Sequence, residues 1–143
     1  MAWYRLAAER GDAPILQERD ALYHRMTHEQ VVESNRIFVE LWRELGDNNL
    51  LLDLIRKDMD ALRARTGSRI PNSGSSPITV VDVRRGESSG DTYYDRIQSR
   101  LEIRINYLDS NVEILDLDLE DNLSVKKSLE LEVREEMAAL GVR

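Results

Sequence analysis

The sequence predicts an all-α protein, in which an N-terminal helical bundle is followed by one long C-terminal amphipathic helix. Apolar residues recur at helical spacing through the first half of the chain, and a heptad pattern without glycine or proline runs through most of the second. Charged residues make up 33% of the chain and aromatic residues only 6%, a balance that suits helices with long charged faces. We therefore expect a bundle at 1–66, a linker at 67–91 with a short extended segment at 78–83, and a coiled-coil-like helix at 92–141.

The chain opens with a predicted helix over residues 2–10, which are rich in helix-forming types. Gly11 is expected to end this helix, because glycine readily adopts the left-handed conformation of a helix C-cap. Asp12 is a candidate N-cap, and Pro14 falls in the first turn of the next helix, where proline is tolerated. The pattern predicts two helices joined by a tight turn.

The run at 2–13, Ala-Trp-Tyr-Arg-Leu-Ala-Ala-Glu-Arg-Gly-Asp-Ala, resembles the second helix and following turn of a Sel1-like repeat. In that family this pattern of small and aromatic residues packs one helix of an αα-hairpin against its neighbours. The resemblance implies an adaptor or scaffold role within a multiprotein assembly. The residues after Ala13 do not restart the repeat, so the resemblance is to a remnant of one unit.

The most clearly marked helix begins at Thr27, which is spaced to form a capping box with Gln30. Trp42 lies on its apolar face and is expected in the core. Residues 46–49 interrupt the helix, and a further helix is predicted at about 50–65. Because the connections are short, these helices should be antiparallel neighbours in the bundle.

The linker at 67–91 is rich in Gly, Ser, Pro and Asn, but it contains the β-branched segment 78–83. An isolated strand is not stable by itself. Three arrangements are therefore open: pairing with another chain, local pairing through a turn at 86–90, or an extended crossing of the bundle.

The C-terminal helix is predicted from two apolar heptad columns, four residues apart, which face a column that is polar at every step. Asn122 and Lys126 interrupt the columns, while Thr92 and Gly141 are suited to capping its two ends. We call the apolar members the interaction seam: Leu101, Ile105, Leu108, Val112, Leu115, Leu119, Leu129, Val133 and Leu140.

An α+β fold with a hairpin at 100–120 is the alternative, because apolar and polar residues also alternate there with a period of two. Such a hairpin would turn at 108–111. The expected turn lacks glycine, and aspartate is depleted in strands, so the helix is preferred. Residues 109–111 and 121–124 are the places where a helix would kink or stop.

The formal charge is −7, and most of it lies in the C-terminal half: residues 92–140 carry twelve acids and six bases, a net of −6. This charge disfavours nucleic acid and anionic membranes as partners and favours a basic protein surface. There is no cysteine, and the chain shows neither a signal-peptide pattern nor an uncharged run long enough to span a bilayer. We expect a soluble protein, whose compartment the sequence leaves open.

Residue patterns for catalysis or cofactor binding are weak. His24 and His28 have helical metal-ligand spacing but no third ligand, and the acids at 116–121 lack the glycine and glutamate of a calcium loop. Ser124 and Lys127 match a four-residue motif of some acyl enzymes without its companion motifs. We therefore predict no catalytic residues, no metal ligands and no cofactor.

These observations predict a non-enzymatic protein–protein interaction or scaffold protein that assembles through its C-terminal helix. Its partner is expected to be another protein, a second copy of the chain, or both. The alternative is a structural subunit of a large particle such as a phage or a secretion machine, in which neighbouring subunits order the segment at 78–83. An enzyme is the least supported class.

Overall fold

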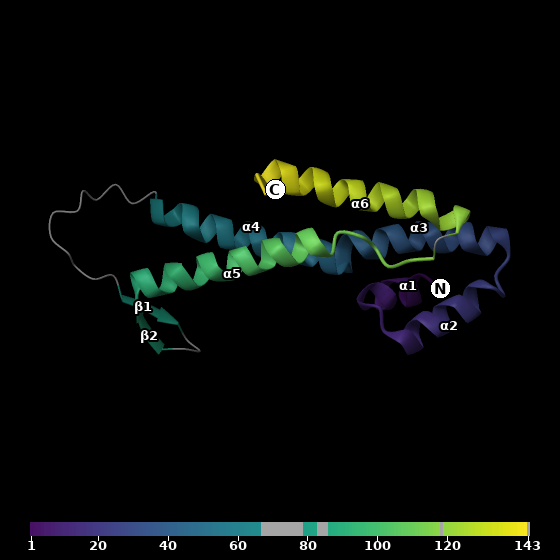
Figure 1. The fold of residues 1–143 in the computed structure, drawn as a ribbon, viewed down its shortest axis with the longest axis horizontal. Helices are drawn as coiled ribbons and strands as arrows, with labels where there is room; N and C mark the ends of the chain where they lie inside the picture. Colours follow the sequence, from purple (N-terminus) through teal and green to yellow (C-terminus); the bar gives the residue numbers. More distant parts are fainter. Residues whose placement is uncertain (67–78, 83–85, 118, 143) are drawn as a thin grey trace. The chain divides into compact units, whose positions relative to one another are not determined.

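The computed structural model describes residues 1–66, 79–82, 86–117 and 119–142. It confirms the all-α class, with one two-stranded hairpin added to the helices. The elements are α1 (Ala2–Ala7), the short 3₁₀ helix η1 (Ala8–Arg10), α2 (Ala13–Tyr23), α3 (His28–Leu45), α4 (Asp47–Thr66), β1 (Thr79–Asp82), β2 (Gly86–Ser89), α5 (Gly90–Ser110) and α6 (Glu120–Leu140) (Figure 1).

The chain forms two compact units. Unit 1 combines Met1–Leu52 with Leu108–Arg143, and unit 2 is Asp53–Tyr107. This division differs from the expected one, because α6 belongs to the same unit as the N-terminal helices instead of forming a separate part.

The helix ends at the start of the chain are those that the sequence predicts. Gly11 follows η1 in the left-handed conformation, with φ of 71°, and Asp12 is the extended N-cap residue of α2. Pro14 lies in the first turn of α2. The predicted tight turn between two helices is therefore confirmed.

Both bonds of the predicted capping box at the start of α3 are present, since Thr27 and Gln30 each accept the other's backbone N–H. The predicted break after this helix falls at Gly46, although α4 begins already at Asp47. A Cβ atom on Gly46 would lie 2.5 Å from the carbonyl oxygen of Trp42, so only glycine fits this position.

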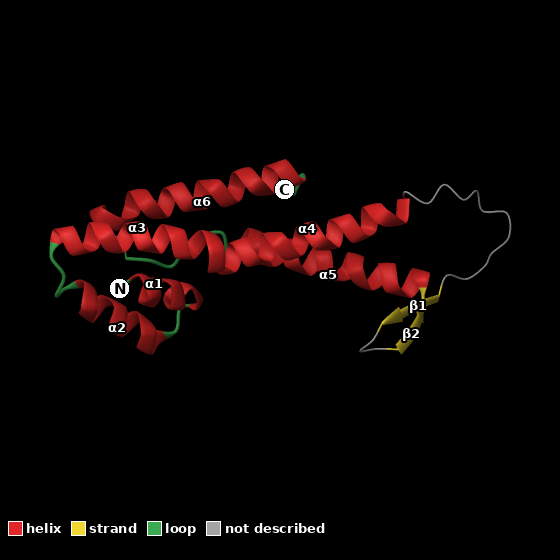
Figure 2. Ribbon diagram, turned by 180° about the vertical axis from the view of Figure 1, so that it is seen from behind, coloured by secondary structure: helices red, strands yellow, loops and turns green. Residues whose placement is uncertain are grey.

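The core of unit 1 is built around α3, which lies between α1 and α6 (Figures 1 and 2). Phe38 and Trp42 of α3 are fully buried, as predicted for Trp42. Leu129 and Val133 of α6 are 1% exposed. Helices α3 and α6 are also joined at their surface, where Arg43 of α3 donates two hydrogen bonds to Glu132 of α6.

In unit 2, α4 and α5 run antiparallel. Arg100 and Arg104 of α5 both bind the buried carboxylate of Asp58, and Arg104 also reaches the Leu54 carbonyl oxygen at 3.3 Å. Residues later in α5 therefore contact residues earlier in α4, as in an antiparallel pair of helices. Ile55 and Ile97 are buried in this unit.

β1 and β2 of unit 2 pair antiparallel, with Thr79 opposite Ser89 and Asp82 opposite Gly86 (Figure 2). The extended conformation predicted for 78–83 is confirmed for residues 79–82, and the remainder of that segment lies outside the described residues. Of the three open arrangements, local pairing is the one found, although Gly86–Ser89 is the second strand and not the turn.

The single helix predicted at 92–141 is wrong. Two helices, α5 and α6, replace it, and residues 111–117 and 119 between them are not helical. The chain turns where Asn111 donates its N–H to the Leu108 carbonyl oxygen, at the predicted weak place. The heptad pattern continued across this point because the irregular segment also contains apolar residues that fit it: Val112 is buried there, whereas Leu115 and Leu119 are exposed.

The alternative hairpin at 100–120 is also absent from the described residues of that range, which are helical or irregular. The predicted cap at Thr92 is wrong as well, since α5 begins at Gly90. Ser89 performs this role by accepting the Thr92 N–H at 3.2 Å.

Candidate functional site

The structure separates the nine residues of the interaction seam. Two of them, Leu101 and Ile105, lie half-buried in unit 2. Four are buried inside unit 1: Leu108, Val112, Leu129 and Val133. Leu115 and Leu119 are exposed in the segment between α5 and α6, and Leu140 is half-buried at the end of α6. The buried members pack within their own chain, so the seam is not one continuous surface that is open to a partner.

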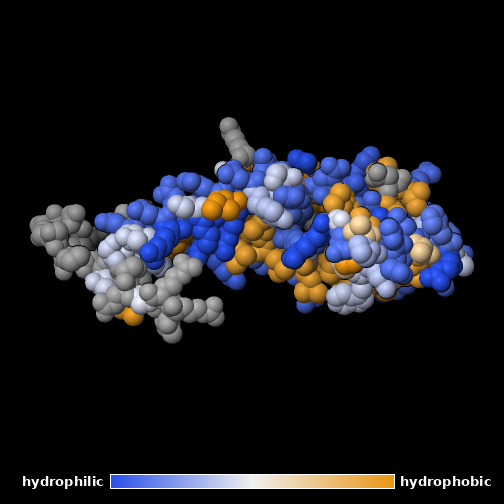
Figure 3. All heavy atoms as spheres, turned by 60° about the horizontal axis from the view of Figure 1, so that its bottom comes forward, coloured by the Kyte–Doolittle hydropathy of each residue, from blue (hydrophilic) through white to orange (hydrophobic). Residues whose placement is uncertain are grey.

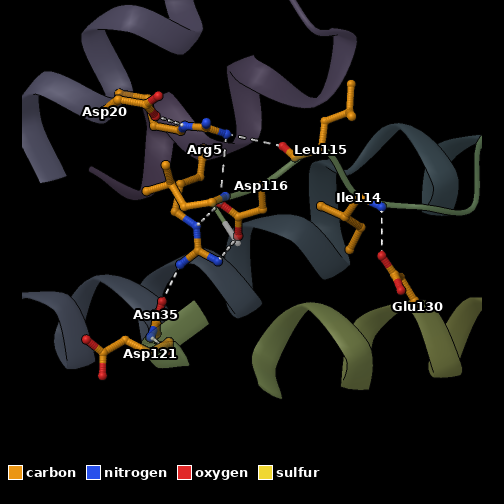
Figure 4. A network of polar contacts seen from close by, with 10 residues as sticks. Arg5, Asp20, Asn35, Ile114, Leu115, Asp116, Asp121 and Glu130 are labelled. Atoms are coloured by element: carbon orange, nitrogen blue, oxygen red, sulfur yellow. Dashed lines mark hydrogen bonds and ion pairs between the residues drawn. The ribbon is translucent and has the colours of Figure 1, made fainter. Parts of the chain in front are cut away.

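The irregular segment before α6 is held in unit 1 by a buried polar network around Arg5 (Figure 4). Arg5 donates to both carboxylate oxygens of Asp116 and to the side-chain oxygen of Asn35. Asn35 in turn donates to the Asp121 carbonyl oxygen at 2.8 Å. The Arg5 guanidinium also lies over the Phe38 ring, 3.9 Å from its centroid.

Electrostatics explain why this network holds a charged pair in the core. Burial lowers the pKa of the Arg5 guanidinium, and the carboxylate of Asp116 opposes that effect. The side chains of both residues are 1% exposed. A substrate therefore has no access to them, and we assign the network a structural role.

A concavity of about 310 Å³ in unit 1 lies beside Glu9, next to Trp3, Leu45 and Asp47. The Glu9 carboxylate accepts the Asp47 N–H at 3.1 Å and so caps the start of α4. Burial raises the pKa of the Glu9 carboxyl to about 7, and the charge of Asp47 also raises it, while the Asp47 N–H and Arg10 lower it. A lone carboxylate without a nucleophile is not a catalytic constellation.

A larger groove, of about 480 Å³, lies between α1 and the first half of α3. We call it the α1–α3 groove. Its lining includes Ala2, Trp3, Met26, Glu29, Glu33 and Ile37. Trp3 is 61% exposed, although tryptophan is highly buried on average. Figure 3 shows apolar surface between hydrophilic side chains on the face of unit 1 that carries α1 and α2.

The polar groups of the groove are few and do not form a catalytic set. The charged side chains among its lining are two glutamates, Glu29 and Glu33, and the lining contains no histidine. Ser34 is 7% exposed and its hydroxyl oxygen has no hydrogen-bond partner among the described residues. An apolar groove with a few polar groups is the form that ligand and helix-binding sites take.

Among the described residues, no group of three or more histidine, aspartate or glutamate side chains is placed to hold a metal ion. No helix in the same residues has the length and apolar content needed to cross a membrane.

Sequence reasoning missed both the Arg5 network and the groove. One signal was present for the first: Arg5 falls between Ala2 and Ala8 at spacings of three, so a charged residue occupies the buried stripe of small residues. The groove had no such signal, because Trp3 and Ile37 come from helices that only the fold brings together.

The fold and these sites define an all-α protein with an apolar groove and a buried ion pair. Comparisons with protein-family models, with curated proteins and with solved structures find no match for this chain.

Proposed function

We propose that the chain is a non-enzymatic protein-interaction module of adaptor or scaffold type, which docks a helical segment of a partner protein in the α1–α3 groove. The observation that carries this proposal is the combination of an open groove of about 480 Å³ with a tryptophan that is 61% exposed at its edge. Tryptophan is one of the residue types enriched among the hot spots of protein interfaces.

The position of the groove supports this role. Its walls are helices, and a groove between two helices accepts the apolar face of a third. Met26 adds a flexible, polarizable side chain to the lining, which suits a surface that adapts to a partner. The resemblance of residues 2–13 to a Sel1-like repeat supports the same class, because that family acts mainly as adaptors.

The proposed interaction surface is the α1–α3 groove and not the C-terminal helix. Leu108, Val112, Leu129 and Val133 are buried in unit 1, so assembly through them would require this unit to open. Trp3, Met26, Glu29, Glu33 and Ile37 of the groove are exposed or half-buried in the folded chain.

A selection of random displayed peptides on the folded chain tests the proposal. We expect enriched peptides to lose about tenfold or more in affinity for Trp3→Ala, because truncation of a hot-spot tryptophan removes most of its buried contact area. Leu131→Ala is the matched control, since Leu131 is also an exposed apolar residue, 55% exposed on α6. Failure to enrich any peptide, or equal losses in the two variants, would contradict a docking role for the groove.

A further inference from the structure

We infer that the segment docked in the α1–α3 groove is a basic amphipathic helix, with an apolar ridge flanked by lysine or arginine. This inference rests on the proposed function and adds the chemistry of the partner. Its basis is that the charged side chains of the groove lining are acidic and its apolar lining comes from both helices.

Charge complementarity argues for a basic occupant. Glu29 and Glu33 are one helical turn apart on α3, at the spacing that places two side chains on one face. Glu33 is bound to Arg36, which also binds Glu40, whereas Glu29 forms no ion pair with any described residue. The lining itself holds two carboxylate side chains, one of them paired with Arg36, within a chain of net charge −7.

The acidic side chains of the groove favour binding of a basic segment over binding of a neutral or acidic segment. A cationic residue of the partner could form an ion pair with Glu29. An acidic residue there would be repelled by the carboxylates of Glu29 and Glu33. Because the glutamates are exposed, they contribute selectivity and association rate more than affinity.

The apolar lining sets the other half of the recognition. Met26 and Ile37 provide half-buried apolar surface, and the exposed Trp3 side chain can cover an inserted aliphatic side chain. A volume of about 480 Å³ has room for a few such side chains on one face of a helix. Ser34 of the lining is 7% exposed, and its buried hydroxyl oxygen lacks a hydrogen-bond partner among the described residues.

The test uses the full chain and two labelled model peptides of about five helical turns. One contains leucine and lysine in an amphipathic pattern, and the other replaces every lysine with glutamate. Binding is measured by fluorescence anisotropy at low and at high salt. We expect the Leu/Lys peptide to bind at least about tenfold more tightly than the Leu/Glu peptide at low salt, with a smaller ratio at high salt.

Substitutions in the groove test whether the preference for the Leu/Lys peptide over the Leu/Glu peptide arises there. Glu29→Gln with Glu33→Gln should weaken the Leu/Lys peptide about fivefold at low salt, since each exposed charge contributes a modest amount. Glu44→Gln with Glu135→Gln is the matched control, because these residues are also exposed carboxylates of unit 1 and lie outside the groove lining. The control should change affinity less than about twofold. Trp3→Ala should weaken both peptides to a similar extent, and circular dichroism confirms that each variant is folded.

The outcomes separate this inference from the proposed function. Equal binding of the two peptides, with both weakened by Trp3→Ala, would overturn the basic partner and leave the docking groove in place. The same loss in both double variants would also overturn it, since the preference would then follow net charge alone. If neither model peptide binds while displayed peptides of other chemistry do, the docking role survives and the basic helix is rejected.

Discussion

The Glu9 carboxyl makes the stability of unit 1 depend on pH in a way that a single substitution removes. Burial raises its pKa to about 7 from an ordinary value of 4.5, so between these values the folded chain holds a proton that the unfolded chain has released. The contribution of Glu9 to stability is therefore complete below about pH 4.5 and is lost as the pH rises through about 7. Glu9→Gln keeps the shape and the hydrogen-bond acceptor for the Asp47 N–H but cannot titrate.

The size of the effect follows from the two pKa values. A difference between about 7 and 4.5 corresponds to about 3 kcal/mol at 1.36 kcal/mol per pKa unit. Glu9 is partly exposed, so solvent screening reduces this to about 1–2 kcal/mol. Between pH 5 and pH 8, Glu9→Gln should therefore gain about 1–2 kcal/mol of unfolding free energy relative to the unsubstituted chain.

Urea unfolding at the two pH values measures this difference. Tryptophan fluorescence reports on unit 1, because Trp3 and Trp42 both lie in it. Glu44→Gln, which removes an exposed carboxylate of α3, controls for the loss of one negative charge and should follow the pH dependence of the unsubstituted chain. If the difference between Glu9→Gln and the unsubstituted chain is the same at both pH values, the burial argument for Glu9 is refuted.

Two further predictions concern buried polar groups of unit 1. Asp116→Asn removes the buried counter-charge of Arg5 and should lower the unfolding free energy by about 3 kcal/mol, whereas a loss below about 1 kcal/mol in urea unfolding would show that the pair is not buried. Asn122 is 1% exposed and neither atom of its amide has a hydrogen-bond partner among the described residues, so Asn122→Leu should raise the unfolding free energy by about 1–2 kcal/mol. A lower denaturation midpoint for this variant would indicate that the amide does have a partner.

Local sequence signals predicted the features that local chemistry determines. Gly11, the capping box of Thr27 and the break at Gly46 all depend on backbone conformation or on bonds within a few residues, and each is present. The apolar periodicity around Leu129 and Val133 also marked the buried face of α6 correctly.

The break between α5 and α6 depends on contacts far along the chain. The apolar residues near Val112 fit a helical heptad, but Asp116 binds Arg5, which is 111 positions away, and this pairing has no signature in the local pattern. The candidate groove was unpredictable for the same reason, since Trp3 and Ile37 acquire a common function only when α1 packs on α3. Composition predicted an acidic C-terminal half, whereas Glu29 and Glu33 of the groove lie in the N-terminal half of the chain.

The most direct test of the groove is a nuclear magnetic resonance titration of the isotope-labelled chain with the Leu/Lys peptide. The docking account predicts that the indole N–H signal of Trp3 and the methyl signals of Met26 and Ile37 shift on titration, while the methyl signals of Leu131 stay in place. Shifts that are centred on α6, or spread evenly over the acidic surface, would contradict it.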